Sequence, residues 1–290
     1  MNDLTEVLHN HLGLTARRIA PLSETNNQVF RVQASDNAQY LLKCFSVSRA
    51  DAYQREVGMR ECLAEFSDIR CPMIIRSVEV DDTHYALFEY VIGESLESLW
   101  DADQRRASNE MERLGAMLAS LHQLPVEQAQ AFLSYEETLY SETYFAGMAD
   151  TIAPYLRAKD IERTLDGCFT IITRQDLEQV VTHADFGPHQ IIASPNGQWV
   201  LLDFEFAAIA PFADDLGGAE IHLEQKHYPE IERFLNGYAT LRPVLADYQP
   251  VRNAFKALNL LAMLTYAIRR GKMPRKQELN RLSQLLSAVA

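Results

Sequence analysis

The chain has 290 residues, of which 47% are hydrophobic and 23% are charged, a composition typical of a globular protein with one large domain or two smaller lobes. Its formal net charge of −13 argues against binding to nucleic acid or to an anionic membrane, because both depend on basic surfaces. The four cysteines form no CxxC pair, which favours buried free thiols over a disulfide framework or a zinc site.

The chain carries no evident targeting or membrane-spanning segment. Its first residues, MNDLTEVLHNHLGL, are too polar for a signal peptide. The longest apolar run, residues 258–268, is shorter than the roughly 20 residues that span a bilayer. We therefore expect a cytoplasmic protein that binds neither nucleic acid nor membrane.

The first ninety residues are predicted to be rich in β-strands. An amphipathic helix at 3–13 precedes three short strands, which polar segments separate and which predict an antiparallel meander: 18–22, 28–33 and 40–45. A helix is expected at 49–66, where Ser48 and Asp51 resemble a capping box. Two further strands follow, at 73–80 and 85–91.

A charged pair is predicted inside this region. Lys43 shares a strand face with Leu41 and Phe45, and burying an unpaired lysine is costly. Glu56 falls on the apolar face of the helix at 49–66, so we expect a Lys43–Glu56 ion pair. The alternative is that both side chains simply reach solvent, as strand lysines and helix glutamates often do.

After Gly93 the pattern becomes helical, which sets the predicted domain boundary: an N-terminal lobe at 1–92 and a helical C-terminal lobe at 93–290. Ser108 is the expected cap of a helix that ends before Pro125. Less regular helices are expected within 133–180, and four more at 214–226, 229–240, 247–270 and 275–289.

One β-hairpin interrupts the helical region. The apolar runs at 191–193 and 199–202 flank the turn sequence Ser-Pro-Asn-Gly. Folding about this turn places Gln190 beside Asp203 and leaves Asp185 just before the first strand. Carboxylate and amide oxygens gathered in this way can hold a hard divalent cation and activate a hydroxyl.

These residues resemble a known family. HADFGPHQ and LLDFE are similar to the catalytic loop and the metal-binding segment of the aminoglycoside phosphotransferase and choline kinase-like enzymes. Lys43, Glu56, FEYVIG and LGAMLASLHQL occur in the family's order, so the resemblance covers most of the chain. It implies an α+β, bilobal, protein-kinase-like fold with a small antiparallel β-sheet lobe, one helix on that lobe, and a larger helical lobe.

The resemblance also implies roles for the polar residues. Asp185 would orient a substrate hydroxyl and accept its proton, while Gln190 and Asp203 would bind Mg²⁺. Lys43, held by Glu56, would contact the phosphates of ATP.

Further nucleotide contacts are implied by position in the family pattern. The backbone of Glu89, Tyr90 and Val91 would bind adenine. The segment from Ser23 to Asn27 would cover the phosphates, although it contains no glycine.

Two more residues are assigned supporting roles by the resemblance: His183 and Asp215 would steady the catalytic loop. Gln190 departs from the commoner Asn of the family, but it offers the same amide oxygen on a stem longer by one methylene.

Several plainer interpretations stay open. Asp185 and Asp203 could be turn or cap residues, and Glu205 could pair locally instead of standing at the metal. His189 is interpreted as a loop residue. Three acidic residues of the following helix could line a site for a cationic acceptor or form a solvated face: Asp214, Glu220 and Glu224.

The leading hypothesis is an ATP- and Mg²⁺-dependent kinase that phosphorylates a small-molecule hydroxyl on an amino sugar, amino alcohol or sugar. The alternative is a nucleotide-binding, pseudokinase-like regulatory module with little turnover, suggested by the glycine-free loop and Gln190. A protein kinase ranks third, because residues 203–215 leave little room for an activation segment.

Overall fold

The computed structural model describes residues 3–24, 27–133, 142–156, 158–173 and 175–289, with the backbone alone described at 23–24, 142–146, 158–160 and 162–164. The chain forms two compact units. The N-terminal unit comprises Met1–Leu96 and Gln190–Ala207, and the helical unit comprises Glu97–His189 and Ala208–Ala290. The sequence placed all of 93–290 in one lobe, whereas the hairpin at 190–207 makes its contacts with the N-terminal residues.

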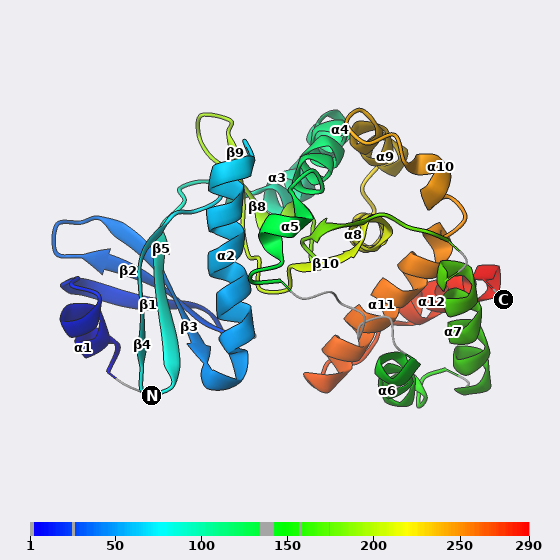
Figure 1. The fold of residues 1–290 in the computed structure, drawn as a ribbon, viewed down its shortest axis with the longest axis horizontal. Coiled ribbons are helices and arrows are strands. Elements are labelled where there is room, and N and C mark those ends of the chain that lie inside the picture. The colour runs from blue at the N-terminus through cyan, green and yellow to red at the C-terminus, as the bar shows by residue number, and fades with distance from the viewer. Residues whose placement is uncertain (1–2, 25–26, 134–141, 157, 174, 290) are drawn as a thin grey trace. The chain divides into compact units, whose positions relative to one another are not determined.

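The N-terminal unit is built on a five-stranded antiparallel sheet of order β1-β2-β3-β5-β4 (Figure 1). The predicted meander is confirmed. In chain order the elements are α1 (Leu4–Glu6), η1 (Val7–His11), β1 (Ala16–Glu24), β2 (Gln28–Ala34), β3 (Gln39–Ser46), η2 (Val47–Arg49), α2 (Ala50–Phe66), β4 (Ile74–Val80), β5 (Thr83–Glu89) and β6 (Glu94–Ser95).

The alternation of β3 determines what each face of the sheet meets. Leu42 and Cys44 are buried with Val7 and Leu8 of η1. On the opposite face, Phe45 is buried against Ala52 of α2. Because side chains alternate along a strand, Lys43 lies on the same face as Phe45 and points toward α2.

Two predicted helix caps are wrong. Val47–Arg49 forms a 3₁₀ turn in which Ser48 Oγ pairs with Ser46 Oγ at 2.9 Å, so α2 begins at Ala50 without the expected capping box. The next long helix begins four residues before Ser108, because the Asp103 carboxylate accepts a hydrogen bond from the Arg105 amide at 3.0 Å and caps it.

The predicted hairpin is confirmed as β8 (Ile191–Ala193) and β9 (Trp199–Leu201). The Leu202 amide donates to the Gln190 carbonyl at 2.8 Å, so the pairing places Gln190 opposite Leu202, one residue before Asp203. β6 adds to β8 after Gly93, whose φ is +156° and whose Cβ would lie 2.4 Å from the Ala193 carbonyl oxygen. Only glycine fits there.

The helical unit is formed by two packed groups of helices and one small sheet. In chain order its elements are α3 (Leu96–Ala102), α4 (Gln104–Leu121), α5 (Val126–Ala129), α6 (Glu142–Ile152), α7 (Ala158–Thr173), β7 (Gln179–Thr182), η3 (Pro188–Gln190), β10 (Ala208–Pro211), α8 (Phe212–Gln225), α9 (Ile231–Ala239), α10 (Leu245–Tyr248), α11 (Arg252–Arg269) and α12 (Lys276–Val289). β7 and β10 pair antiparallel. The helix expected at 247–270 is divided into α10 and α11.

Glycines allow α4 and α9 to pack at backbone contact. A Cβ at Gly115 would lie 1.9 Å from the Phe234 carbonyl oxygen, and one at Gly237 would lie 2.0 Å from that of Glu112. A separate apolar core joins α6, α7, α8, α11 and α12. This packing holds α8, which carries Asp215, against its neighbours.

No helix in the described part of the chain is both long and apolar enough to cross a bilayer.

Candidate active site

A buried cation joins two carboxylates in the N-terminal unit. Lys43 Nζ donates to Glu56 Oε1 at 2.9 Å and to Asp203 Oδ1 at 2.8 Å. The predicted Lys43–Glu56 ion pair is therefore confirmed. Asp203 comes from a distant part of the sequence and joins it because the β8–β9 hairpin belongs to this unit.

Glu56 is the centre of this network and is fully buried. Besides Lys43, its Oε1 accepts a hydrogen bond from the Arg60 guanidinium at 2.5 Å. Its Oε2 accepts a hydrogen bond from the Phe204 amide at 2.6 Å. Burial alone would raise the pKa of Glu56, but the Lys43 and Arg60 cations outweigh it and lower the pKa to about 2. Glu56 is thus ionised at neutral pH and fixes the residue that follows Asp203.

The ammonium of Lys43 is likewise kept charged. Burial would lower its pKa, but Glu56 and Asp203 raise the pKa above the ordinary lysine value. The side chain of Lys43 is 9% exposed, whereas that of Asp203 is 33% exposed. The Asp203 carboxylate is therefore bound to a buried lysine while part of its side chain remains exposed.

The donor set fits a hard divalent cation. Asp203 has a φ of +61°, a left-handed conformation, and stands next to Leu202, whose amide holds the backbone of Gln190. Both Gln190 and Asp203 are partly exposed and offer oxygen ligands. Carboxylate and amide oxygens are the ligands that Mg²⁺ accepts.

Glu205 is occupied within the N-terminal unit. The Asn27 amide donates to its carboxylate, and Arg49 lies 3.3 Å from Oε1. Arg55 Nε donates to its carbonyl oxygen at 2.9 Å. Local pairing is therefore the observed arrangement, and it fixes one end of the segment predicted to cover the phosphates. The side chain of Ser23, at the other end, lies outside the described residues.

The segment predicted to hold adenine begins at the end of β5. The Glu89 amide donates to the Met73 carbonyl at 2.9 Å, and its carboxylate pairs with Arg70. Arg31 stacks over the Tyr90 ring, 4.7 Å from its centroid. The Glu89 N–H already donates to the Met73 carbonyl. Tyr90 and Val91 therefore remain the candidate N–H donors of the segment.

In the helical unit, Asp215 holds the backbone of the loop that carries Asp185. Its carboxylate accepts the amides of His183 and Ala184, both at 2.7 Å. Ala184 has a φ of +60°, and His183 is fully buried with its ring edge-on to Phe186. These contacts agree with the supporting roles expected for His183 and Asp215.

Sequence reasoning missed two residues behind Asp215. His122 Nε2 contacts Asp215 Oδ2 at 3.0 Å, and His122 Nδ1 contacts the Tyr238 hydroxyl at 2.7 Å. Burial lowers the pKa of His122 more than Asp215 raises it. The signal in the sequence was a histidine at the end of the apolar stripe of α4, where it continues the buried face.

The side chain of Asp185 is more exposed than that of Asp203. The side chain is 43% exposed, and Oδ1 lies 3.3 Å from His189 Nε2. The backbone of the two residues before it is held by Asp215. The structure places Asp185 and its holding residues in the helical unit, whereas Lys43, Glu56, Gln190 and Asp203 lie in the N-terminal unit.

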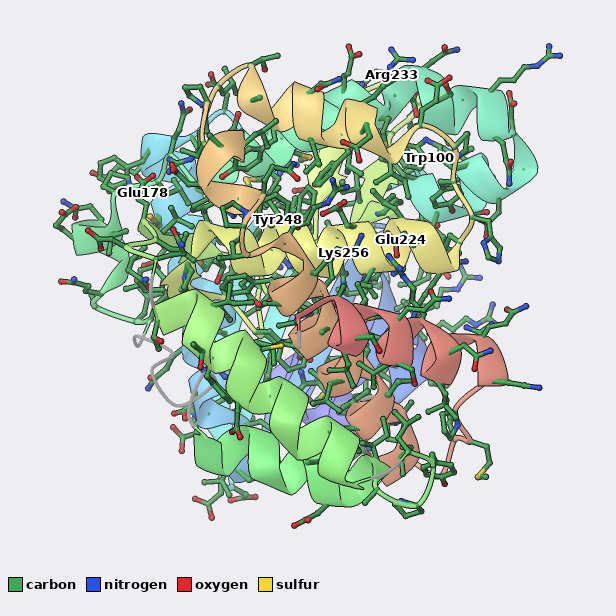
Figure 2. All side chains as sticks on the ribbon, turned by 90° about the vertical axis from the view of Figure 1, so that its right-hand side faces the viewer. Trp100, Glu178, Glu224, Arg233, Tyr248 and Lys256 are labelled. Carbon is green, nitrogen blue, oxygen red and sulfur yellow. The ribbon has the colours of Figure 1, made fainter. Side chains whose placement is uncertain are left out.

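Two acidic residues of α8, Glu220 and Glu224, are paired with nearby cations. Buried Glu220 accepts from the Tyr248 hydroxyl at 2.5 Å and from Arg252 Nε at 2.9 Å. Glu224 pairs with Lys256, as Figure 2 allows the reader to follow. Neither residue is part of a solvated acidic face.

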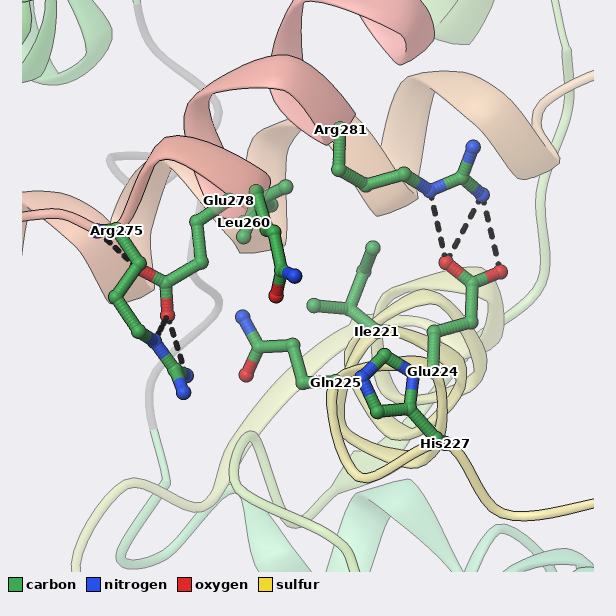
Figure 3. A pocket seen from close by; sticks show the side chains of 9 residues that line it. Ile221, Glu224, Gln225, His227, Leu260, Arg275, Glu278 and Arg281 are labelled. Atoms are coloured by element: carbon green, nitrogen blue, oxygen red, sulfur yellow. Dashed lines mark hydrogen bonds and ion pairs between the residues drawn. The ribbon is translucent and has the colours of Figure 1, made fainter.

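A pocket of about 330 Å³ opens beside the C-terminal end of α8 (Figure 3). Its carboxylates are again paired: Arg275 Nε donates to Glu278 Oε1 at 3.0 Å, and Arg281 binds Glu224 with two bonds of 2.9 and 3.0 Å. The remaining lining residues are Ile221, Gln225, His227, Leu260 and Gln277. The pocket therefore combines paired charges and side-chain amides with a lining surface that is mostly apolar.

Comparisons with known proteins agree with this architecture. The sequence profile of the phosphotransferase enzyme family matches residues 18–252. No curated protein matches the chain. Among solved structures, the apo form of a thermostable mutant of aminoglycoside phosphotransferase APH(4)-Ia is similar at a TM-score of 0.72 and 15% identity, covering 98% of this chain and 97% of that one.

Two liganded structures have the same fold. A ternary complex of an APH(4)-Ia mutant with AMP-PNP and hygromycin B has a TM-score of 0.70 and 14% identity, with 100% and 98% coverage. The GDP and kanamycin complex of an APH(2″) enzyme has a TM-score of 0.70 and 15% identity, with 99% and 97% coverage. The family match and the shared fold lead to one conclusion: the chain belongs to the phosphotransferase enzyme family and has the protein-kinase-like fold of these aminoglycoside phosphotransferases.

Proposed function

We propose that the protein transfers the γ-phosphate of ATP to a hydroxyl of a small molecule, with Mg²⁺ and with Asp185 as the catalytic base. The observation that carries this proposal is the bridge from Glu56 through Lys43 to Asp203. A buried lysine that already holds a partly exposed carboxylate offers a fixed cation for phosphate oxygens. Phosphoryl transfer depends mainly on such positioning and charge neutralisation.

On the nucleotide side, Lys43 binds the phosphates while Glu56 keeps its ammonium in place. Gln190 and Asp203 hold Mg²⁺, which supplies charge neutralisation at the phosphates when bound. Tyr90 and Val91 offer backbone N–H groups to adenine. Asn27, fixed by Glu205, and Ser23 belong to the segment that covers the phosphates.

On the acceptor side, Asp185 orients the hydroxyl and takes its proton. Its half-exposed carboxylate can reach a bound substrate, while Asp215 keeps its loop in place through the amides of His183 and Ala184. General-base catalysis of this kind contributes about 10²- to 10⁴-fold to a rate.

We further propose that the pocket beside α8 contributes to acceptor binding. A chain of contacts leads to it from Asp185, through His189 and then His222 of α8. Gln225, three positions along the same helix face, lines the pocket. The paired carboxylates and amides suit an acceptor with several hydroxyl groups, such as a sugar or amino sugar. Solved proteins of the same fold have been captured with hygromycin B and with kanamycin.

The proposal is tested by measuring ADP release with ATP and Mg²⁺ against a panel of sugars, amino sugars and amino alcohols. Asp185→Asn should lower turnover about 10³-fold, and Asp203→Asn should abolish it. The controls are Asp247→Asn in the helical unit and Asp81→Asn in the N-terminal unit, both at exposed aspartates. Asp81 has a φ of +45°, which asparagine tolerates.

Two outcomes would contradict the assignment. Wild-type turnover in a folded Asp185→Asn protein would remove Asp185 as the base. Mg²⁺-dependent ATP binding without turnover on any member of the panel would favour the regulatory-module alternative. Thermal shifts with ATP, measured with and without Mg²⁺, detect that binding directly.

A further inference from the structure

A second cluster of metal-binding side chains lies next to Asp185 in the helical unit. It consists of Glu97 of α3, His189 of η3 and His222 of α8, whose ligand atoms all lie within 4.8 Å of one another. His222 Nε2 lies 3.1 Å from Glu97 Oε1, and the rings of His189 and His222 are 4.3 Å apart at their centroids. Three separate elements thus converge on one point.

One nitrogen of the cluster is buried without a hydrogen-bond partner in the described part of the chain. His189 Nε2 faces Asp185 at 3.3 Å, which leaves Nδ1 as this nitrogen. Buried polar atoms are normally paired, so an unsatisfied nitrogen calls for an explanation. A cation at Nδ1 would supply one.

Gly187 keeps the space beside this nitrogen open. A Cβ at Gly187 would lie 2.9 Å from His189 Nδ1 and 3.2 Å from His222 Cδ2. Gly187 is not among the glycines with positive φ, so its backbone does not demand glycine. The absence of a side chain therefore matters here for the room that it leaves between the two rings.

Glu97 is a ready anionic ligand. A glutamate carboxylate is ionised at neutral pH, so Glu97 offers a negatively charged oxygen to a cation. Lys226 lies 3.3 Å from Glu97, but it also binds Asp101 at 3.0 Å and is about one third exposed. Lys226 can therefore keep Asp101 as its partner while Glu97 binds a cation.

We propose that Glu97, His189 and His222 form a binding site for Zn²⁺ or a similar transition-metal cation, separate from the Mg²⁺ site at Gln190 and Asp203. Two imidazoles and one carboxylate are ligands typical of Zn²⁺, whereas Mg²⁺ prefers oxygen alone. Three protein ligands leave a fourth position for water. Bond lengths of about 2.0–2.2 Å require ligand atoms roughly 3.4 Å apart, which small side-chain rotations provide.

The site would also act on Asp185. A cation at His189 Nδ1 leaves the proton on Nε2, which then donates to the Asp185 carboxylate and fixes the ring's tautomer. His189, interpreted from the sequence as a loop residue, would be both a metal ligand and a positioning residue for the base. Only this consequence rests on the proposed function, because metal binding itself needs neither ATP nor acceptor.

The test is competition for Zn²⁺ between the chelator-treated full chain and a chromophoric chelator, without nucleotide. The wild-type protein should bind one Zn²⁺ per chain, and excess Mg²⁺ should not displace it. His222→Ala and Gly187→Ala should each weaken binding at least about tenfold. The first removes a ligand, and the second keeps all three ligand residues but places a methyl group 2.9 Å from the observed position of His189 Nδ1. Co²⁺ should give the visible absorption of a four-coordinate site.

His227→Asn is the matched control: it removes a neighbouring, exposed histidine with a φ of +56°, and binding should not change. If His222→Ala fails to fold, His222→Gln keeps a hydrogen-bond donor toward Glu97 and should still weaken binding. Zn²⁺ binding that is absent from the wild-type protein, or equal in the wild-type, His222→Gln and Gly187→Ala proteins, would overturn the proposal.

Discussion

Asp203 and Asp185, the two aspartates proposed to carry the chemistry, are held in different ways by their two units. Asp203 is held at its side chain by the Lys43 cation, which Glu56 holds in turn. Asp185 is held through the backbone of the preceding residues, whose amides bind Asp215, and its own carboxylate stays half exposed.

This difference matches the two tasks. A carboxylate that helps to hold a cation and phosphates gains from a fixed charge environment, and the buried ion network provides one. A base must meet a substrate hydroxyl and accept its proton, so its carboxylate must stay accessible. The comparison predicts that the N-terminal unit is most sensitive to lost charge, and the helical unit to lost hydrogen bonds.

The largest effect is expected from Glu56→Gln. The substitution leaves Lys43 and Arg60 close together in a buried site without the anion between them, and removing one member of a buried ion pair costs about 3 kcal/mol or more. The free energy of unfolding should fall by about that amount in urea titrations followed by circular dichroism.

Glu61→Gln is its control, because Glu61 lies exposed on the same helix and should change stability little. Equal stability of the Glu56 and Glu61 variants would show that the network contributes no net stabilisation. It would also remove the reason for treating the N-terminal unit as the more charge-dependent of the two.

A smaller effect is expected from Asp215→Asn. Asparagine keeps the shape of the side chain, but its NH₂ group replaces an acceptor oxygen and faces groups that are themselves donors. About one buried donor is then left without an acceptor, at a cost of about 2 kcal/mol. Turnover should fall while ATP affinity is retained, because the contacts of Asp215 with the Asp185 loop and with His122 all lie in the helical unit. Urea titration and nucleotide titration measure the two quantities.

Asp214→Asn is the neighbouring control, since Asp214 is only half-buried and receives the Asn259 amide at 2.9 Å. Loss of ATP affinity in Asp215→Asn, but not in Asp214→Asn, would contradict the separation of tasks between the two units.

The sequence predicted the parts of this arrangement that depend on local pattern. The face of Lys43 follows from strand alternation, the hairpin follows from its Asn-Gly turn, and the inward position of Glu56 follows from helical spacing. The fold class was confirmed because the family resemblance, which rests on motifs such as HADFGPHQ and LLDFE, extends over most of the chain.

The rest depends on contacts between distant segments, which no local pattern records. The pairing of Asn27 with Glu205 and of His122 with Asp215 joins residues 178 and 93 positions apart. The start of α4 was misplaced because both Asp103 and Ser108 are acceptable caps, and in the structure the helix is capped by Asp103.

The smallest predicted effect is a pH dependence that separates the units. The pKa of buried His122 is lowered from the ordinary value of 6.5, so the unfolded chain binds a proton that the folded chain does not. Its contribution to stability is therefore complete above pH 6.5 and is lost as the pH falls below it. Glu56, with a pKa lowered from 4.5 to about 2, loses its contribution only below pH 4.5. Between pH 7.5 and 5.5 the loss from His122 amounts to at most about 1.4 kcal/mol.

His122→Gln, which keeps an amide toward Asp215, should abolish that part of the loss in urea titrations at the two pH values, while Glu56→Gln should leave it unchanged. The same pH loss in His122→Gln as in the wild-type protein would mean that another group titrates.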